Sequence, residues 1–598
     1  MILQEILANK NDEYGLYFRI LGVSFKNENE LVLVQNTILN TDTYYNSFSI
    51  EKWKQYCNVN KIKLFITIQG DARISIIHSI IDENKQLKNS IILSKIISIP
   101  AKHEIEIELP DVLSGVVYFR IECLSKNVYF YGAKYVTDSV EREINIALNI
   151  CTFRREHLLL RNIELIKKQF IQKKDSPLYG HLKIFIIDNG RTLNADSFVT
   201  KDVYLFHNPN VGGAGGFSRG LLEISKRKEI EQITNVIFMD DDIEVLPEAL
   251  LRTYRMLKIL KPKYEHAFLA GAILRQDYKY IQFENAAQWN EGKVLSLNQG
   301  LDLRAYKNVV YNEIEKACEY AAWCYCCIPI KILTPENLAI PVFIHMDDIE
   351  YSLRNTDKII TLNGISVIHP VSGQRIESAN IYYDFRNMMI LDAKYCPTYK
   401  KTKIKKELLN RMFNLYIRYR YKDIKLLYQA VDDFCKGPDW LMRLDAVTYH
   451  IKIKKEGYRF EDVSKIVGQK IPFYDQYDSP IIDYFGNKKR RWTINKIIKL
   501  IIIIFTINGI YLPPKGKKAF GMNVSPARFF RHPEIVLYDK NSMQGITLRK
   551  DVKKFFSFIK YYIKACGIIN KKYNFIQKEY EQSWNKLHGQ NYWKKVLK

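Results

Sequence analysis

Residues 236–250 read VIFMDDDIEVLPEAL, an apolar run that ends in three consecutive carboxylates, Asp240, Asp241 and Asp242. Like charges at the end of a buried strand repel one another unless a cation or a hydrogen-bond donor compensates them. If the backbone stays extended there, the first and third side chains point to the same side. We therefore expect Asp240 and Asp242 to share one divalent ion, and Asp241 to cap the following turn or helix.

The chain around this run alternates apolar strands with helical spacing, which is typical of a parallel sheet with crossover helices. The strands are expected at 144–153, 182–190, 202–210 and 235–243. Helical spacing is shown by Leu159, Ile163, Ile166 and Phe170 and again by Phe217, Leu221 and Ile224. Ligands bind such sheets at the carboxyl ends of the strands, where this chain places Thr152, Arg155, Asp188, Asn189, Asn208 and Asn210.

A glycine-rich segment, NPNVGGAGGFSRG at 208–220, joins a strand to a helix. Backbone amides and a helix N-terminus can approach a phosphate or a sugar there. The segment lacks the GK[ST] of a P-loop, and Ser218 stands where the third glycine of GxGxxG would be, so neither an ATPase nor a dinucleotide enzyme is favoured. Without an acidic motif downstream, a tight turn with close helix packing would be the better interpretation.

A second acidic pair, Asp347 and Asp348 in FIHMDDIEYSLRN, follows another apolar segment and opens an expected helix. One of the two can cap that helix while the other accepts a proton from an attacking hydroxyl. His369, in GISVIHPVSG, ends a further apolar run. A lone histidine is usually structural, but imidazole suits a metal site beside carboxylates, so His369 is a candidate ligand.

The flanking regions differ in composition and pattern. Segments 105–109 and 117–123 alternate apolar and polar residues, so we expect a β-sandwich or β-barrel module at 1–140. The α/β catalytic domain is expected at 141–395. A basic helical region is expected at 396–598, with an apolar stripe over 424–434 that Gly437 and Pro438 end.

Lysine and arginine outnumber aspartate and glutamate by 90 to 65, so an anionic partner is expected. Acidic motifs at strand ends speak against nucleic acid. The start of the sequence has no signal-peptide pattern, which favours a cytoplasmic protein. The ten cysteines form no disulfide framework and are interpreted as reduced core thiols, with a metal site at the cluster of Cys324, Cys326 and Cys327 as the less favoured alternative. The apolar stretch 497–513 is too short to span a bilayer and is read as a buried or interfacial helix.

Together these motifs resemble the polymerising galactofuranosyltransferases, which are family 2 inverting glycosyltransferases with a GT-A (Rossmann-like) mixed sheet. The resemblance is carried by CTFRR (151–155), IIDNG (186–190), NVGGAGGFSRG (210–220), FMDDDIEVLPEAL (238–250), WCYCCIP (323–329), FIHMDDIEYSLR (343–354) and VIHP (367–370). It also extends to the plan of a β-rich module, a catalytic sheet and a helical C-terminal region.

The resemblance implies a Mn²⁺ or Mg²⁺ ion on the donor diphosphate of a UDP-sugar, most simply UDP-galactofuranose. Its ligands would be Asp240, Asp242 and His369. The uridine and sugar-phosphate side would be lined by Arg155, Asp188, Asn210 and Asp240.

The resemblance further implies that Asp348 is the general base, with Asp347 beside it, although the residues alone leave open which of the two acts. Trp323 and Glu284 would contact the acceptor, a glycan or a polyprenyl-diphosphate-linked glycan. The enzyme would then work at the inner face of an anionic membrane, with homo-oligomers possible. One departure is Cys324, where the family carries a second tryptophan, and it puts the acceptor and the furanose in question.

Three alternatives remain at this point. The same sheet and metal site could serve a rhamnosyltransferase or another hexosyltransferase, because fold does not fix substrate. A basic nucleic-acid-binding protein without catalysis would show basic residues interleaved with exposed aromatics along one surface. An inactive transferase domain could serve as a scaffold, which the intact acidic motifs disfavour.

Overall fold

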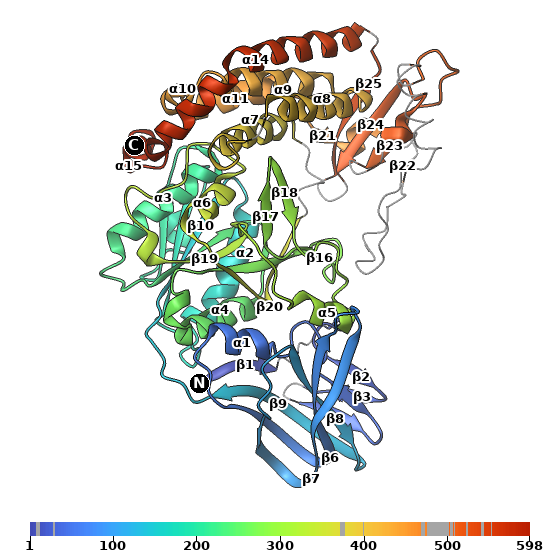
Figure 1. Ribbon diagram of the computed structural model, residues 1–598. Coiled ribbons are helices and arrows are strands. Elements are labelled where there is room, and N and C mark those ends of the chain that lie inside the picture. Colours follow the sequence, from blue (N-terminus) through green and yellow to red (C-terminus); the bar gives the residue numbers. More distant parts are fainter. Residues whose placement is uncertain are drawn as a thin grey trace.

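The computed structural model describes residues 1–6, 12–27, 30–370, 377–398, 400–467, 473–474, 502, 506, 509–521, 524, 526–539, 543–551 and 553–597. A strand-rich N-terminal region and a largely helical C-terminal region lie on opposite sides of a central α/β domain (Figure 1). Within these ranges no helix combines the length and apolarity needed to cross a membrane. Most of the 497–513 stretch and the basic 486–492 cluster lie outside the described residues.

The N-terminal region is one nine-stranded sheet, which confirms the prediction of a β-rich module. Its elements are β1 (Ile2–Ile6), β2 (Arg19–Leu21), β3 (Ser24–Lys26), β4 (Leu31–Val34), β5 (Ile38–Asn40), α1 (Ile50–Tyr56), β6 (Ile62–Ile81), β7 (Leu87–Glu108), β8 (Val116–Cys123) and β9 (Asn127–Thr137). The long strand β6 pairs with β9 before Gly70 and with β8 after it. Gly70 has φ +111°, a conformation that suits glycine, and lets the backbone change partners there.

The central domain is built on a second nine-stranded sheet with the order β12-β11-β10-β13-β19-β15-β20-β14, to which β16 is added at β15. Its strands are β10 (Ile146–Thr152), β11 (Leu182–Asp188), β12 (Val203–His207), β13 (Asn235–Asp240), β14 (Glu244–Val245), β15 (Phe268–Arg275), β16 (Gln282–Glu284), β19 (Tyr325–Pro329) and β20 (Ile359–His369). A separate hairpin is formed by β17 (Ala287–Asn290) and β18 (Lys293–Ser296).

The four predicted strands of this domain are confirmed, and they run parallel in the order β12-β11-β10-β13. The chain therefore builds outward from β10 in both directions, and the sheet has a topological switch point between β10 and β13. Beyond β13 the sheet becomes mixed, because β19 runs antiparallel to both β13 and β15. Thr152 and Asp240 end the two strands at the switch point.

The helices of this domain are α2 (Glu156–Ile166), α3 (Gly212–Arg227), α4 (Pro247–Ile259), α5 (Tyr306–Asn312) and α6 (Asp347–Asn355). Helix α3 is the glycine-rich segment, and it packs closely on β10. A Cβ atom at Gly216 would lie 2.1 Å from Cys151 Sγ, and one at Gly220 would lie 1.8 Å from Asn149 Oδ1. These glycines therefore let α3 approach the sheet and bring its N-terminus to the switch point.

Substituting Gly220 by alanine should destabilise the protein by about 1–3 kcal/mol, because the added methyl overlaps the buried Asn149. Gly567→Ala is the matched control, since a Cβ there meets no atom within 4 Å and alanine favours a helix by about 1 kcal/mol. Chemical denaturation of both variants measures the difference. A Gly220→Ala protein as stable as the wild type would contradict close packing of α3.

The C-terminal region contains helices α7 (Ser378–Tyr395), α8 (Lys401–Ile417), α9 (Tyr421–Phe434), α10 (Pro438–Arg443), α11 (Ala446–Glu456), α12 (Val463–Val467), α14 (Lys553–Leu587) and α15 (Gln590–Val596). The predicted 424–434 stripe is buried in α9. The region is not purely helical, however, because it also holds a five-stranded sheet of β21 (Glu461–Asp462), β22 (Phe473–Tyr474), β23 (Lys518–Gly521), β24 (Glu534–Asp539) and β25 (Gln544–Arg549). These strands are short and depend on long-range pairing, so they show little of the apolar–polar alternation from which strands are predicted.

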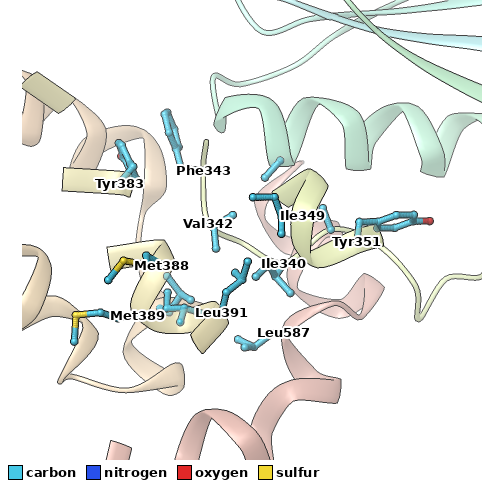
Figure 2. Packing of buried hydrophobic residues seen from close by; sticks show 14 of the residues in the cluster. Ile340, Val342, Phe343, Ile349, Tyr351, Tyr383, Met388, Met389, Leu391 and Leu587 are labelled. Carbon is cyan, nitrogen blue, oxygen red and sulfur yellow. The ribbon is translucent and has the colours of Figure 1, made fainter. Parts of the chain in front are cut away.

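Among the contacts that join the helical region to the central domain, two involve the segment before α6 and helix α3. Ile340 and Val342, which precede α6, pack with Met388 and Leu391 of α7 and with Leu587 at the end of α14 (Figure 2). At the other contact, Trp593 of α15 is buried beside α3 and donates its indole N–H to the Ala339 carbonyl at 2.8 Å. The C-terminal helices therefore support the two elements, α3 and α6, that reach the switch point.

Candidate functional site

The carboxylates after β13 and the histidine that ends β20 converge at the switch point. His369 Nε2 lies 3.6 Å from Asp240 Oδ2 and 3.3 Å from Asp242 Oδ1. Burial lowers the pKa of His369, but the neighbouring Cys324 and the two carboxylates outweigh it and raise that pKa well above its usual value. Asp240 and Asp242 thus both face His369 Nε2 as predicted, although β13 ends at Asp240 and residues 241–242 form a turn rather than an extended strand.

The Asp241 side chain does not face His369 but binds residues at the end of the neighbouring strand β10. It accepts hydrogen bonds from Thr152 Oγ1 at 2.8 Å and from Arg155 Nη1 at 2.9 Å. The expectation that Asp241 caps the following turn or helix is wrong, because its carboxylate accepts from Thr152 and Arg155 instead, and α4 begins after Leu246 without a side-chain cap. The shared guanidinium of Arg155 also lies 2.9 Å from Asp242 Oδ2, so it neutralises part of the acidic cluster.

The donor set at this point fits a divalent ion. Two carboxylates and one imidazole converge from two strand ends, and such oxygen and nitrogen ligands suit Mn²⁺-type cations. The geometry follows from pairing, since β20 lies beside β15 and β15 is linked to β13 through β19. Asp240, Asp242 and His369 are therefore the residues that would hold the metal.

Cys324 belongs to the same cluster, which sequence reasoning missed. Its Sγ, an Asp240 oxygen and a His369 nitrogen all lie within 4.8 Å of one another. The Asp240 N–H also donates to the Cys324 carbonyl at 3.4 Å, because β19 runs antiparallel to β13. Burial raises the pKa of the Cys324 thiol to about 12. The sequence shows that Cys324 directly precedes an apolar run, but its position at the same sheet edge as the aspartates depends on the antiparallel pairing of β19 with β13.

The loops after β11 and β12 form the next part of the site. Asp188 is fully buried and accepts hydrogen bonds from the backbone N–H groups of Gly190, Thr192 and Leu193 at 2.7–2.9 Å. Its carboxylate therefore shapes the 189–193 loop. Asn210 Oδ1 lies 3.3 Å from the Gly212 N–H at the start of α3. Contact of either residue with a nucleotide stays a prediction.

A strained loop presents the second acidic pair. Phe343, His345 and Met346 have φ of +76°, +65° and +72°, values that cost energy in residues other than glycine. Asn387 of α7 holds this loop by donating to the carbonyls of Ile344 at 2.8 Å and His345 at 3.0 Å. Asp347 and Asp348 then open α6, whose N-cap residue Met346 makes no side-chain cap bond. The conformation of this loop thus places both carboxylates at the start of α6.

The two aspartates face different neighbours. A Cβ atom on Gly213 would lie 3.6 Å from Asp347 Oδ2, so Asp347 sits against the N-terminus of α3. Burial raises the pKa of Asp348, and the Asp240 charge acts in the same direction. The Asp348 charge in turn raises the pKa of Glu284. Asp348 is therefore close enough to both Asp240 and Glu284 to interact with them electrostatically.

The predicted acceptor residues lie beside Asp348 and in the core. Glu284, at the end of β16, is buried, and it accepts from Ser296 Oγ at 2.6 Å and from the Tyr320 hydroxyl at 3.3 Å. Burial raises the pKa of Glu284 to about 7. Trp323 is 4% exposed and stacks on Phe238 at 4.3 Å, so one face of its ring is covered. Its indole N–H has no hydrogen-bond partner among the described residues.

The raised pKa of Glu284 makes stability depend on pH. Because folding favours the protonated acid, its stabilisation is complete below pH about 4.5 and is lost as pH rises through about 7, by up to roughly 3 kcal/mol. Glu284→Gln carries no titrating group and should flatten this slope. Unfolding free energies of both proteins between pH 5 and 8 test the prediction, and parallel curves would contradict it.

With this geometry in hand, sequence comparison finds two family matches. Residues 22–138 match the model described as galactofuranosyltransferase 2 N-terminal, and residues 148–279 match glycosyl transferase family 2. The galactofuranosyltransferase GlfT2 of Mycobacterium tuberculosis is 23% identical over 429 residues, which cover 67% of this chain and 66% of that protein. The protein of the same name from Mycolicibacterium smegmatis is 23% identical over 432 residues, 67% of this chain and 64% of that protein. The chain thus spans just under two thirds of the length of both relatives.

Among solved structures, a mannosyltransferase PcManGT from Pyrobaculum calidifontis in complex with GDP-Man and Mn²⁺ is 14% identical to the chain. The match covers 53% of this chain and 81% of that one with a TM-score of 0.29, a value too low to bear on the assignment. The mixed sheet, its switch point and the family matches agree independently of it. The central domain thus has a GT-A glycosyltransferase fold, in which residues 148–279 match the family 2 model, and residues 22–138 are similar to the galactofuranosyltransferase 2 N-terminal domain.

Proposed function

We propose that this chain is an inverting, metal-dependent glycosyltransferase that moves galactofuranose from UDP-galactofuranose onto a growing glycan or a lipid-linked acceptor. The observation that carries the proposal is the convergence of Asp240, Asp242 and His369 at the switch point of a family 2 domain. Similarity to two proteins named galactofuranosyltransferase supports the donor sugar.

The proposed reaction is a single displacement. Asp348 takes the proton of an acceptor hydroxyl, whose oxygen forms the new bond to the anomeric carbon. The bond from that carbon to the diphosphate breaks, and UDP leaves with the electron pair. When bound, the divalent ion supplies Lewis-acid stabilisation of the leaving diphosphate. The N-terminus of α3 lies beside Asp347, and a helix N-terminus favours negative charge near it.

On the acceptor side, we assign sugar recognition to two groups. The unpartnered Trp323 indole N–H can donate to a sugar oxygen, and Glu284 can accept from a hydroxyl or, when protonated, donate to an oxygen. Both assignments rest on the resemblance as well as on placement.

A panel of nucleotide sugars offered to the purified full chain with Mn²⁺ tests the donor. Release of UDP from UDP-galactofuranose, with sugar appearing on an acceptor, is the expected result. A rhamnosyltransferase or another hexosyltransferase would instead turn over its own nucleotide sugar, since the fold leaves the sugar open. Absence of turnover with every UDP-sugar would contradict the donor assignment.

We further propose that the basic helical region contacts an anionic membrane surface, as a lipid-linked acceptor would require. Helix α14 exposes Phe556, Ile563 and Phe575, and lysines such as Lys560 and Lys564 lie exposed on it as well. Apolar side chains with basic neighbours favour a phospholipid interface. Co-sedimentation with vesicles rich in phosphatidylglycerol should fall several-fold in a Phe556→Ser, Ile563→Ser protein. Equal sedimentation of the two proteins would contradict it.

A further inference from the structure

We propose that the thiol of Cys324 is an additional ligand of the ion held by Asp240, Asp242 and His369, and that it gives the site a preference for softer cations. This inference rests on the proposed metal site. It adds a sulfur ligand to a set that otherwise offers only carboxylate oxygens and an imidazole nitrogen. Cys324 is also the position at which the family that the chain resembles carries a second tryptophan.

The geometry is that of a shared coordination point. Cys324 Sγ, an Asp240 oxygen and a His369 nitrogen lie mutually within 4.8 Å, so one ion can sit between all three. Zinc–sulfur bonds of about 2.3 Å and metal–nitrogen bonds of about 2.1 Å place ligand atoms at such separations. Asp240 ends β13, His369 ends β20 and Cys324 directly precedes β19, so the sheet itself fixes the spacing of the three residues.

The other thiols of the same motif have different surroundings. Cys326 and Cys327 are fully buried members of two apolar clusters. Cys324 is only partly buried, and two of its neighbours are ionisable side chains, Asp240 and His369. A purely structural thiol would be expected among apolar atoms, as the other two are.

Ligand chemistry predicts the consequence. Carboxylate and water ligands suit Mg²⁺ and Mn²⁺, whereas thiolate ligands favour Zn²⁺ and related soft cations. On binding, the sulfur–hydrogen bond of Cys324 is replaced by a sulfur–metal bond, and the proton passes to the solvent. The chain should therefore bind Zn²⁺ and Co²⁺ more tightly, relative to Mg²⁺, than the same site without the thiol.

Titration of the metal-free full chain with Co²⁺ tests the proposal without an activity assay. A thiolate-to-cobalt charge-transfer band in the near ultraviolet should appear in the wild type and be lost in Cys324→Ser. Calorimetry should show Co²⁺ and Zn²⁺ affinity falling about tenfold or more in that variant, while Mg²⁺ affinity changes much less. Cys566→Ser, on α14, is the matched control and should keep the band.

The outcomes separate this inference from the function. If Co²⁺ binds the wild type with no thiolate band, or if Cys324→Ser keeps the band, the thiol is not a ligand and the inference is wrong. The carboxylate–histidine site then still stands. If neither Co²⁺ nor Mn²⁺ binds the wild type, or if Asp242→Asn leaves both affinities unchanged, the metal site itself is wrong. Circular dichroism of each variant confirms that the fold is intact.

Discussion

Replacing Asp348 by asparagine should lower kcat by about 10²–10⁴-fold, the usual contribution of a general base. The substitution keeps the size of the side chain. The Ile349 N–H, which donates to the Asp348 carboxylate at 2.8 Å, can donate to the amide oxygen instead. Binding of the metal and of the nucleotide should therefore persist. Steady-state kinetics together with calorimetric UDP binding measure the two effects separately.

Two further substitutions give this experiment its controls. Asp357→Asn changes an exposed aspartate just beyond α6 and should leave turnover unaltered. Asp347→Asn removes the carboxylate that lies against α3, so its effect should fall mainly on the KM of the donor. If Asp347→Asn loses turnover and Asp348→Asn does not, the roles are reversed. If both keep turnover, neither carboxylate is the base.

The pH profile adds a second readout of the same assignment. Burial raises the pKa of Asp348, so its carboxylate is protonated at a higher pH than an ordinary aspartate. A protonated base cannot accept the hydroxyl proton, and kcat/KM should fall as pH decreases through that raised pKa. An acid limb at the ordinary aspartate pKa of about 4 would show that the group stays exposed in the working enzyme.

Much of the catalytic domain could be predicted because its signals are local. The strands that end at Thr152, Asp188 and Asp240 are short apolar runs, and parallel order brings their carboxyl ends to one edge. Asp240 and Asp242 face the same side as predicted, although a turn at 241–242 and not the pleat of a strand brings them there. Even the packing interpretation of the glycines proved correct, since Gly216 lies against Cys151.

What could not be predicted depends on partners far apart in the sequence. Cys324 reaches Asp240 only because β19 inserts antiparallel between β13 and β15, a pairing that no local pattern encodes. The resemblance implies that Trp323 contacts the acceptor, but it does not reveal that Phe238 covers one face of the ring. Asp241 was read as a helix cap, but a strand 89 residues earlier supplies its partner, Thr152. In each case the deciding contact is tertiary and overrides the local pattern.

Replacing Asp242 by asparagine should abolish metal-dependent turnover, because a neutral amide replaces one of the two carboxylates that face His369 Nε2. Losing the ion removes several kcal/mol of stabilisation from the departing diphosphate; about 4 kcal/mol corresponds to roughly a thousandfold in rate. A chelator should have the same effect on the wild type, and added Mn²⁺ should reverse it there alone.

Asp241→Asn is the matched neighbour for this experiment. Its amide oxygen can still accept from Thr152 or Arg155, and its side chain points away from the ion, so Mn²⁺ affinity should change far less than in Asp242→Asn. Calorimetric Mn²⁺ titration of both variants gives that comparison directly. Equal affinities in Asp242→Asn and the wild type would mean that the carboxylate–histidine cluster does not hold the ion, and the transferase mechanism would then need another source of positive charge beside the leaving diphosphate.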